Sequence, residues 1–264
     1  MKIGVIGGGV VGRATARAWL EHCDEVRIYD VNKARSTHGP VEVAKCDWIF
    51  VCLPELSLDN PFVLKDRVAR VGSPSMGSTY VIRSTTPIGT CRRIAAQYDM
   101  PKLLHWPEFL TARCAMTDAQ CPARNVVGGQ PGPQRIQFSN LLAKRFPGVA
   151  THWLSWEGSE MVKLMTNAAF AAKVALWNEF RSLADAIFDG DDEEWEAIRQ
   201  AILADGRIGA SHTMVPGPDG QHGFGGSCLP KDVKHLADAL IDAGLPHHML
   251  SAALTRNTKD RKEK

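Results

Sequence analysis

A glycine-rich turn between a short apolar run and a helical pattern is the feature that most constrains how this chain folds. The turn, residues 7–12, directly follows the strand-like run Lys2 to Ile6 and leads into an alanine-rich helical stretch. Such glycines permit a tight turn and the close approach of a pyrophosphate to a helix start. A second strand, Val26 to Tyr29, ends in Asp30 at the spacing of a ribose-binding acid, which predicts a dinucleotide-binding unit. The predicted contacts to the dinucleotide are Gly7, Gly9, Val10, Val11, Gly12 and Asp30.

Two residues after the second strand bear on which dinucleotide is bound. The carboxylate of Asp30 can accept hydrogen bonds from both ribose hydroxyls and repels a 2′-phosphate, which favours NAD over NADP. Arg35 follows five residues later, and its guanidinium tolerates that phosphate. The sequence therefore predicts NAD as the cofactor and leaves NADP as the alternative.

Strand-like and helical segments alternate through the rest of the first half. The expected strands are Asp47 to Leu53, Tyr80 to Arg83, Lys102 to His105 and Asn125 to Val127, and the expected helices are Phe62 to Val71 and Gln130 to Arg145. This alternation predicts an α/β fold, a Rossmann-type doubly wound parallel sheet with ligands at its carboxyl edge. Pro54, Ser84 and Thr85 follow two of these strands, so we expect them at that edge, Pro54 and Ser84 as cofactor contacts.

The segment Trp106-Pro107-Glu108-Phe109-Leu110 follows another of these strands and places a carboxylate among apolar neighbours. A carboxyl group in such surroundings is suited to general acid or base work. A structural salt bridge explains Glu108 equally well from the sequence alone.

The second half of the chain is predicted to be helical. A helical pattern runs from Glu157 to Phe188, longer than most helices of globular domains, so it needs a partner to cover it. Lys163 and Asn167 are four residues apart and share one face. They can hold an oxyanion or sugar hydroxyls together, or they form a solvated polar stripe. We predict two domains, residues 1–154 for the dinucleotide and residues 155–264 as an all-α central domain.

A cysteine stands where a later helix is expected to begin. Gly223 to Ser227 precede Cys228, and Pro230 with the apolar residues after it predicts a helix start. Free N–H groups at this start, with the charge of Lys231, favour the thiolate. Asp232 lies one turn further on the same face, where it can orient water. We therefore predict Cys228 as a nucleophile, against the alternative of a structural cysteine.

Composition sets the remaining limits. The chain has 264 residues and a formal net charge of +2, which predicts neither a nucleic-acid surface nor a membrane surface. No stretch approaches the roughly 20 apolar residues of a membrane span, and no leader is recognised, so we expect a cytoplasmic protein. Its seven cysteines are scattered without paired spacing, which predicts neither a disulfide framework nor a metal site.

These motifs together resemble the UDP-glucose/GDP-mannose dehydrogenase family, in the order found there and over nearly the whole chain. The matching stretches are Gly7 to Gly12 with Asp30 to Arg35, Ser84 to Pro87, Pro107 to Leu110, Lys163 with Asn167, Arg207 to Gly209, and Gly223 to Asp232. The resemblance implies NAD-dependent oxidation of a nucleotide sugar's C6 alcohol to the carboxylate. It implies two steps of two electrons, through a thiohemiacetal and a thioester on Cys228.

The resemblance also implies roles for individual residues. Lys163 and Asn167 would stabilise the oxyanion, Asp232 and Thr85 would position water or a proton carrier, and Glu108 would assist thioester hydrolysis. Arg35 and Asp30 would hold the adenosine ribose side of NAD. The implied substrate contacts are Phe109, Leu110, Arg207, Phe224 and Gly225. Arg207 would reach the substrate of a neighbouring subunit, in a homodimer formed by the central helices.

Three features depart from the family pattern. The chain stops at Lys264, before the further nucleotide-binding domain that family members carry, Trp106 replaces an asparagine, and Ala112 and Arg113 replace an acid and a glycine. The substrate is then a nucleotide sugar held by fewer contacts, a smaller sugar derivative, or one for which another polypeptide supplies the domain. The alternative functions are a two-electron β-hydroxyacid dehydrogenase of the 6-phosphogluconate or hydroxyisobutyrate type, and a non-catalytic NAD-binding subunit.

Overall fold

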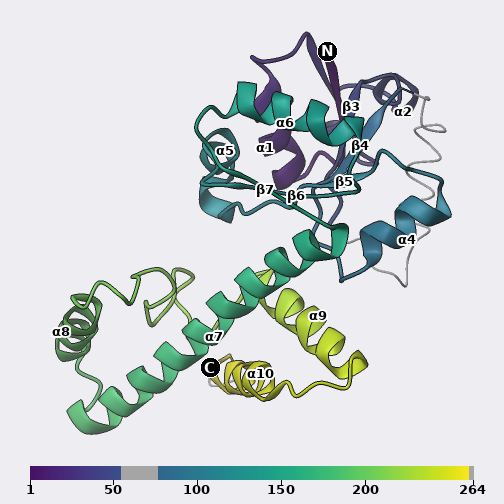
Figure 1. Cartoon of the computed structure of the whole chain (residues 1–264). Helices are drawn as coiled ribbons and strands as arrows, with labels where there is room; N and C mark the ends of the chain where they lie inside the picture. The colour runs from purple at the N-terminus through teal and green to yellow at the C-terminus, as the bar shows by residue number, and fades with distance from the viewer. Residues whose placement is uncertain (55–76, 262–264) are drawn as a thin grey trace. The chain divides into compact units, whose positions relative to one another are not determined.

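The computed structural model describes residues 1–54 and 77–261, and these divide into two compact units (Figure 1). Unit 1 is Met1–Lys163 and unit 2 is Leu164–Lys264. The division lies inside the long helix α7 (Trp156–Phe188), nine residues beyond the predicted boundary after residue 154. The predicted helix from Phe62 to Val71 lies outside the described residues.

Unit 1 contains a seven-stranded sheet in the order β2-β1-β3-β4-β5-β6-β7. The strands are β1 (Lys2–Ile6), β2 (Glu25–Tyr29), β3 (Trp48–Val51), β4 (Thr79–Ile82), β5 (Leu104–His105), β6 (Asn125–Gly128) and β7 (Thr151–Leu154). Neighbouring strands are parallel except β5 and β6, which pair antiparallel through His105 and Gly128. The Rossmann-type prediction is confirmed, with the last two strands reversed against the others.

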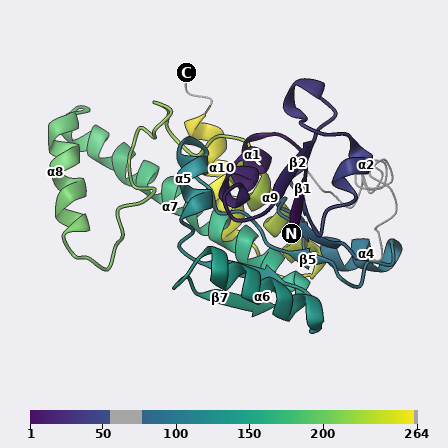
Figure 2. The same ribbon diagram turned by 90° about the horizontal axis from the view of Figure 1, so that it is seen from above.

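Side chains alternate between two apolar layers along each central strand, as the two-residue period of a strand requires. Val5 and Phe50 belong to one buried cluster, whereas Ile6 and Val51 belong to the other. The first cluster includes residues of α1 (Val10–Trp19), α5 (Ala115–Gln120) and α6 (Pro133–Arg145). The second includes residues of α2 (Pro40–Val43) and α4 (Thr90–Gln97). Helices therefore cover both faces, and α1 and α5 lie side by side (Figures 1 and 2).

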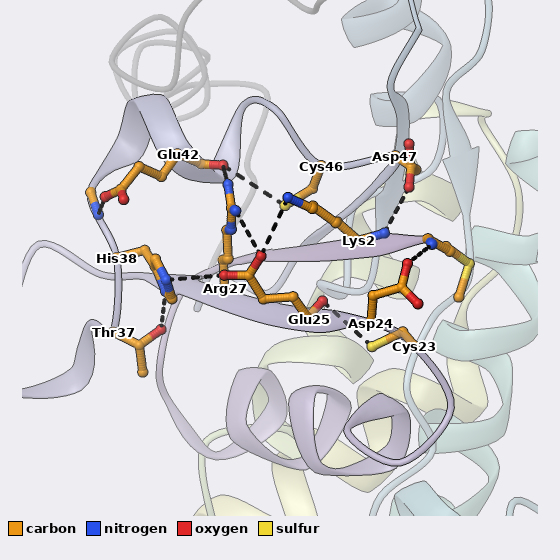
Figure 3. A network of polar contacts seen from close by, with 12 residues as sticks. Lys2, Cys23, Asp24, Glu25, Arg27, Thr37, His38, Glu42, Cys46 and Asp47 are labelled. Atoms are coloured by element: carbon orange, nitrogen blue, oxygen red, sulfur yellow. Dashed lines mark hydrogen bonds and ion pairs between the residues drawn. The ribbon is translucent and has the colours of Figure 1, made fainter.

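The outermost strand β2 carries polar contacts that occupy its edge (Figure 3). Arg27 donates to a Glu25 carboxylate oxygen at 2.7 Å and to the main-chain oxygen of Glu42 at 2.8 Å. His38 Nε2 lies 3.4 Å from the other Glu25 oxygen. Charged side chains of this kind prevent an edge strand from pairing with another chain.

Unit 2 consists of helices. Beyond its share of α7 it contains α8 (Asp192–Leu203), α9 (Leu229–Asp242) and α10 (His248–Asp260), of which α9 and α10 pack against each other. The side chain of Asp191 accepts from the N–H groups of Glu193 and Glu194 and so caps α8. No helix in the described ranges is long and apolar enough to cross a membrane.

Candidate active site

The predicted residues of unit 1 gather at one edge of the sheet because β1 to β5 are parallel and end there. Gly7 follows β1, Asp30 follows β2, Ser84 and Thr85 come soon after β4, and Glu108 comes soon after β5. Since β1 lies between β2 and β3, the strand order reverses at this point. Open α/β sheets bind ligands at the carboxyl ends of their strands, at the point where the strand order reverses.

The glycines of the first turn serve two different purposes. Gly7 has φ +100°, and a Cβ there would lie 2.3 Å from the Cys52 carbonyl oxygen. A Cβ on Gly12 would lie 1.7 Å from the Gly7 oxygen, so these two glycines are needed for packing. A Cβ on Gly9 would meet no atom within 4 Å, and α1 begins there without a capping side chain. Open space beside uncapped N–H groups fits the pyrophosphate of a dinucleotide.

Asp30 is held against the glycine turn by main-chain hydrogen bonds. Its Oδ2 accepts from Gly8 N at 2.7 Å, and its Oδ1 accepts from Asn32 N at 2.8 Å. The side chain is half-buried at the end of β2, where a ribose would follow a pyrophosphate bound at Gly9. Arg35 is exposed, and its backbone lies against Gly8. The residues present therefore fit an adenosine dinucleotide.

The loop after β4 is fixed by a carboxylate that the sequence analysis missed. Glu160 of α7 is fully buried and accepts from Thr86 Oγ1 at 3.0 Å, Gly89 N at 2.6 Å and Cys91 N at 2.8 Å. It therefore caps α4 and holds the segment that carries Ser84 and Thr85. Burial raises the pKa of Glu160.

Ser84 links the ends of strands β3 and β4. Two other predicted residues at this edge, Thr85 and Pro54, remain accessible. The Ser84 Oγ accepts from Leu53 N at 2.9 Å, so the segment after β3 is linked to the segment after β4. Thr85 is half-buried and Pro54 is exposed at the same edge. Ser84 is itself buried. Its hydrogen bond from Leu53 N therefore positions the neighbouring residues of the predicted cofactor site.

Glu108 and Lys163 form a buried ion pair in unit 1. The Lys163 Nζ lies 3.3 Å from Glu108 Oε1, and the two residues are 4% and 9% exposed. The second carboxylate oxygen of Glu108 accepts from Leu110 N at 2.7 Å, and Lys163 Nζ lies 5.3 Å from the centre of the Phe109 ring. Glu108 therefore forms a salt bridge, as one of the two interpretations predicted, and its partner is Lys163, the predicted catalytic lysine.

A buried histidine near the Glu108–Lys163 pair was also not predicted from the sequence. His105 has no exposed surface, its Nδ1 lies 2.6 Å from Ser159 Oγ, and its Nε2 lies 3.4 Å from the Ser84 carbonyl oxygen. Burial lowers the pKa of His105 to about 3. The imidazole is therefore neutral at physiological pH and links β5 to α7.

His105 should make unit 1 less stable as the pH falls. Its folded-state pKa of about 3 lies below the ordinary value of 6.5, so between these values only the unfolded chain binds the proton. Above pH 6.5 the effect is absent. Between pH 6 and 4, we expect the wild-type free energy of unfolding to fall about 1.4 kcal/mol per pH unit more steeply than that of His105→Gln. Urea titrations measure this, with the exposed His152→Gln as control. Equal slopes for wild type and His105→Gln would contradict it.

In unit 2 Asn167 and Asp232 are joined directly. Asn167 Nδ2 donates to Asp232 Oδ2 at 2.5 Å, and Lys231 donates to the other oxygen of the same carboxylate. Asp232 is fully buried and Asn167 is 7% exposed. The Asp232 carboxylate thus fixes the side-chain amide of Asn167, which lies four residues after Lys163 on α7. The amide oxygen of Asn167 takes no part in this hydrogen bond.

Cys228 is exposed and occupies the residue before α9, as predicted. Asp232 N donates to the Cys228 carbonyl oxygen at 2.9 Å, which is the first turn of that helix. The helix N-terminus has no capping side chain, so its N–H groups remain available near the sulfur. The geometry fits a nucleophile that a substrate can reach.

The glycine loop before the cysteine is fixed by two asparagines. Gly223 N donates to Asn178 Oδ1 at 3.0 Å, and Phe224 N donates to Asn257 Oδ1 at 2.6 Å. Phe224 is only 2% exposed, so its ring packs inside unit 2, whereas Gly225 is half-buried against the Arg261 guanidinium. Asn178, Asn257 and Arg261 could not be predicted from the sequence, because all three are distant from this loop along the chain.

Arg207 lies at the surface of unit 2. Its side chain is 88% exposed and forms an ion pair with Asp205. Within the described ranges, no group of three or more histidine, cysteine or acidic residues is arranged to hold a metal ion.

Comparisons with known proteins place these features in context. Residues 157–259 match the UDP-glucose/GDP-mannose dehydrogenase family, central domain. The UDP-glucose 6-dehydrogenase of Streptococcus pneumoniae is 26% identical over 307 residues, which cover 100% of this chain and 74% of the relative. Of three other relatives with the same name, this chain covers 42%, 66% and 59% of their length. It therefore spans only part of its curated relatives.

Solved structures agree in fold. A UDP-glucose dehydrogenase from the hyperthermophilic archaeon Pyrobaculum islandicum superposes with a TM-score of 0.76 at 25% identity, covering 98% of this chain and 68% of that one. A 3-hydroxyisobutyrate dehydrogenase from Mycobacterium tuberculosis has the same TM-score at 18% identity, covering 99% of this chain and 94% of that one. At that identity the second likeness shows the fold alone.

Proposed function

We propose that the chain belongs to the UDP-glucose/GDP-mannose dehydrogenase family, whose central domain matches residues 157–259, and that it is an NAD-dependent dehydrogenase that oxidises the C6 alcohol of a nucleotide sugar to a carboxylate. The observation that carries the proposal is the exposed Cys228 thiol at the start of α9, one turn before the buried Asp232. A single two-electron oxidation of an alcohol requires no thiol. An accessible nucleophile in this setting supports oxidation by four electrons.

The cofactor is proposed to lie on the glycine turn of unit 1. The uncapped start of α1 and the open space at Gly9 suit its pyrophosphate, and Asp30 suits its ribose. Bound NAD accepts two electrons and a proton from the substrate carbon in each oxidation. The loop that contains Thr85 is held in place by Glu160, which supports a fixed approach of substrate and cofactor.

Cys228 is proposed to carry the second oxidation. The first oxidation converts the alcohol to an aldehyde, and the thiolate adds to its carbonyl carbon to form a thiohemiacetal. The second oxidation converts this adduct to a thioester. Water then attacks the thioester carbon, the C–S bond breaks, and the carboxylate product leaves with the thiol regenerated.

The polar residues are proposed to divide the remaining work. The Lys163 ammonium and the Asn167 amide stabilise the oxyanion of the thiohemiacetal and of the tetrahedral intermediate in hydrolysis. Glu108, with one oxygen on Lys163 and one on Leu110 N, is proposed to assist the attacking water. Asp232 holds Asn167 in position, and Thr85 is proposed to position water at the sheet edge.

The number of NADH molecules formed per substrate consumed tests this function. The purified chain should form two NADH per molecule oxidised, with a panel of UDP-sugars, GDP-mannose and simpler sugar phosphates as candidate substrates. One NADH per substrate would instead assign it to the two-electron β-hydroxyacid dehydrogenases. NAD binding without turnover of any panel member would indicate a non-catalytic subunit.

The chain is also proposed to form a homodimer through α7. Leu176, Phe180, Leu183 and Ile187 recur at intervals of four, three and four residues, so they share one face of the helix. They are between 40% and 62% exposed. A continuous apolar stripe of this kind on a helix supports burial against a second copy.

A charge placed in the stripe should dissociate the dimer. Ile187→Glu would desolvate a carboxylate in the interface, so we expect at least about a 100-fold weaker dimer. Sedimentation velocity measures the change. Ile136→Glu is a matched control, because Ile136 lies on α6 and is 66% exposed against 61% for Ile187. A wild-type monomer, or equal dissociation of both variants, would refute the proposed interface.

A further inference from the structure

A cavity of about 260 Å³ lies in unit 1, next to the Glu108 carboxylate. Arg83 and Arg124 line it together with the segment from Trp106 to Thr111, so it borders the predicted substrate residues Phe109 and Leu110. Neither arginine belongs to the residues given a function above. Both line a space that is smaller than the roughly 300–1,000 Å³ of a typical ligand pocket.

Arg83 is a buried cation with few partners. Its side chain is 4% exposed, and its guanidinium stacks on the Trp106 ring, with Cζ 3.9 Å from the ring centre. One terminal nitrogen donates to the Trp106 carbonyl oxygen at 3.2 Å, while the buried Nε has no hydrogen-bond partner. A guanidinium carries five N–H donors, and leaving them unsatisfied in the interior is costly. Burial accordingly lowers the pKa of Arg83.

Arg124 is the second cation of the cavity. It is half-buried, and its Cζ lies 4.5 Å from the centre of the Phe109 ring. Like Arg83, it forms no ion pair with a carboxylate in the part of the chain that the structure describes. The stacking fixes the plane of each guanidinium and leaves N–H donors at its edge. This arrangement suits bidentate recognition of a carboxylate or phosphate.

The two carboxylates of the cavity wall are already engaged. Glu108 accepts from Lys163 and from Leu110 N, and Asp118 accepts from Thr111 N at 2.7 Å. Lys163, which is not part of the lining, neutralises Glu108, so Arg83 and Arg124 remain opposite the single carboxylate of Asp118. The cavity keeps an excess of one positive charge, which an anionic group would neutralise.

We propose that this cavity binds a small oxyanion group of the substrate, a carboxylate or a phosphate monoester, through Arg83 and Arg124. That the bound group belongs to a sugar substrate rests on the proposed function. That the group is an anion rests on the two arginines of the cavity. The volume accommodates one such group. The enzyme is therefore selective for sugar derivatives that carry a negatively charged substituent besides any diphosphate.

Direct titration tests the site without requiring turnover. The full chain is titrated at constant ionic strength with methyl phosphate and, separately, with acetate, and saturable binding is followed by calorimetry. We expect Arg124→Gln and Arg83→Gln to weaken binding at least about tenfold. Arg93→Gln is the control, since Arg93 lies exposed on α4, and it should bind as the wild type does. Arg124→Gln alone decides the test if Arg83→Gln does not fold.

The outcomes separate this proposal from the proposed function. Tighter binding of methyl phosphate or of acetate identifies the group, and either result supports the site if Arg124→Gln weakens that binding. No saturable binding, or equal affinity in Arg124→Gln and Arg93→Gln, would overturn it even if the enzyme is active. With an active enzyme, Arg124→Gln should also raise KM at least about tenfold for phosphate- or carboxylate-bearing sugars, with kcat little changed.

Discussion

Cys228→Ser is expected to end the reaction after the first two electrons. A serine hydroxyl at the start of α9 adds to an aldehyde far less readily than a thiolate, and an ester is not formed from it at a useful rate. We expect the second oxidation to slow by on the order of 10³-fold or more, so that NADH formed per substrate consumed falls from two to one at most. The aldehyde should accumulate, free or as its hydrate, and can be trapped with hydroxylamine.

The matched control is another exposed thiol. Cys114 is also free and exposed, so Cys114→Ser removes a reactive sulfur without touching the α9 start. It should retain two NADH per substrate. If Cys228→Ser also retained two, the covalent route would be wrong and water would have to add to the aldehyde directly. Loss of NAD binding in Cys228→Ser would indicate misfolding, and tryptophan fluorescence in the presence of NAD monitors this.

Local patterns were sufficient to place the residues at the carboxyl edge of the sheet. Gly7, Asp30 and Thr85 each follow an apolar run with a clear period, so their place at a strand end could be predicted from neighbours in sequence. The same holds for Cys228, which Pro230 and the apolar residues after it mark as a helix start. The orientation of β6 could not be predicted, because its local pattern is the same in a parallel or an antiparallel pair.

The residues that the sequence did not reveal act across long separations in the chain. Glu160 reaches Thr86, which is 74 residues away, and His105 reaches Ser159, which is 54 residues away. A buried carboxylate in a helix looks, in sequence, like any solvated glutamate. Only the fold shows that its oxygens meet the N–H groups of Gly89 and Cys91. For the same reason the role of Arg83 could not be predicted. Its position next to a strand end does not indicate that its guanidinium stacks on the Trp106 ring.

Lys163→Met is expected to reduce both stability and turnover. The Glu108 carboxylate would remain buried after its partner is lost, and breaking a buried pair in this way costs about 3–5 kcal/mol of the free energy of unfolding. Loss of the ammonium should also lower kcat by about 10²–10³-fold, because the oxyanion would lose its charged partner. Urea unfolding measures the first effect and NADH formation measures the second.

The double variant Lys163→Met/Glu108→Gln separates these two effects. A neutral glutamine side chain can still accept from Leu110 N, and it leaves no unpaired charge beside Phe109. We expect it to recover most of the stability lost in Lys163→Met, while turnover stays at the level of the single variant or below. Recovery of turnover together with stability would show that Lys163 acts only by supporting the fold. Lost stability without recovery would show that Lys163 stabilises unit 1 through its packing and not through Glu108.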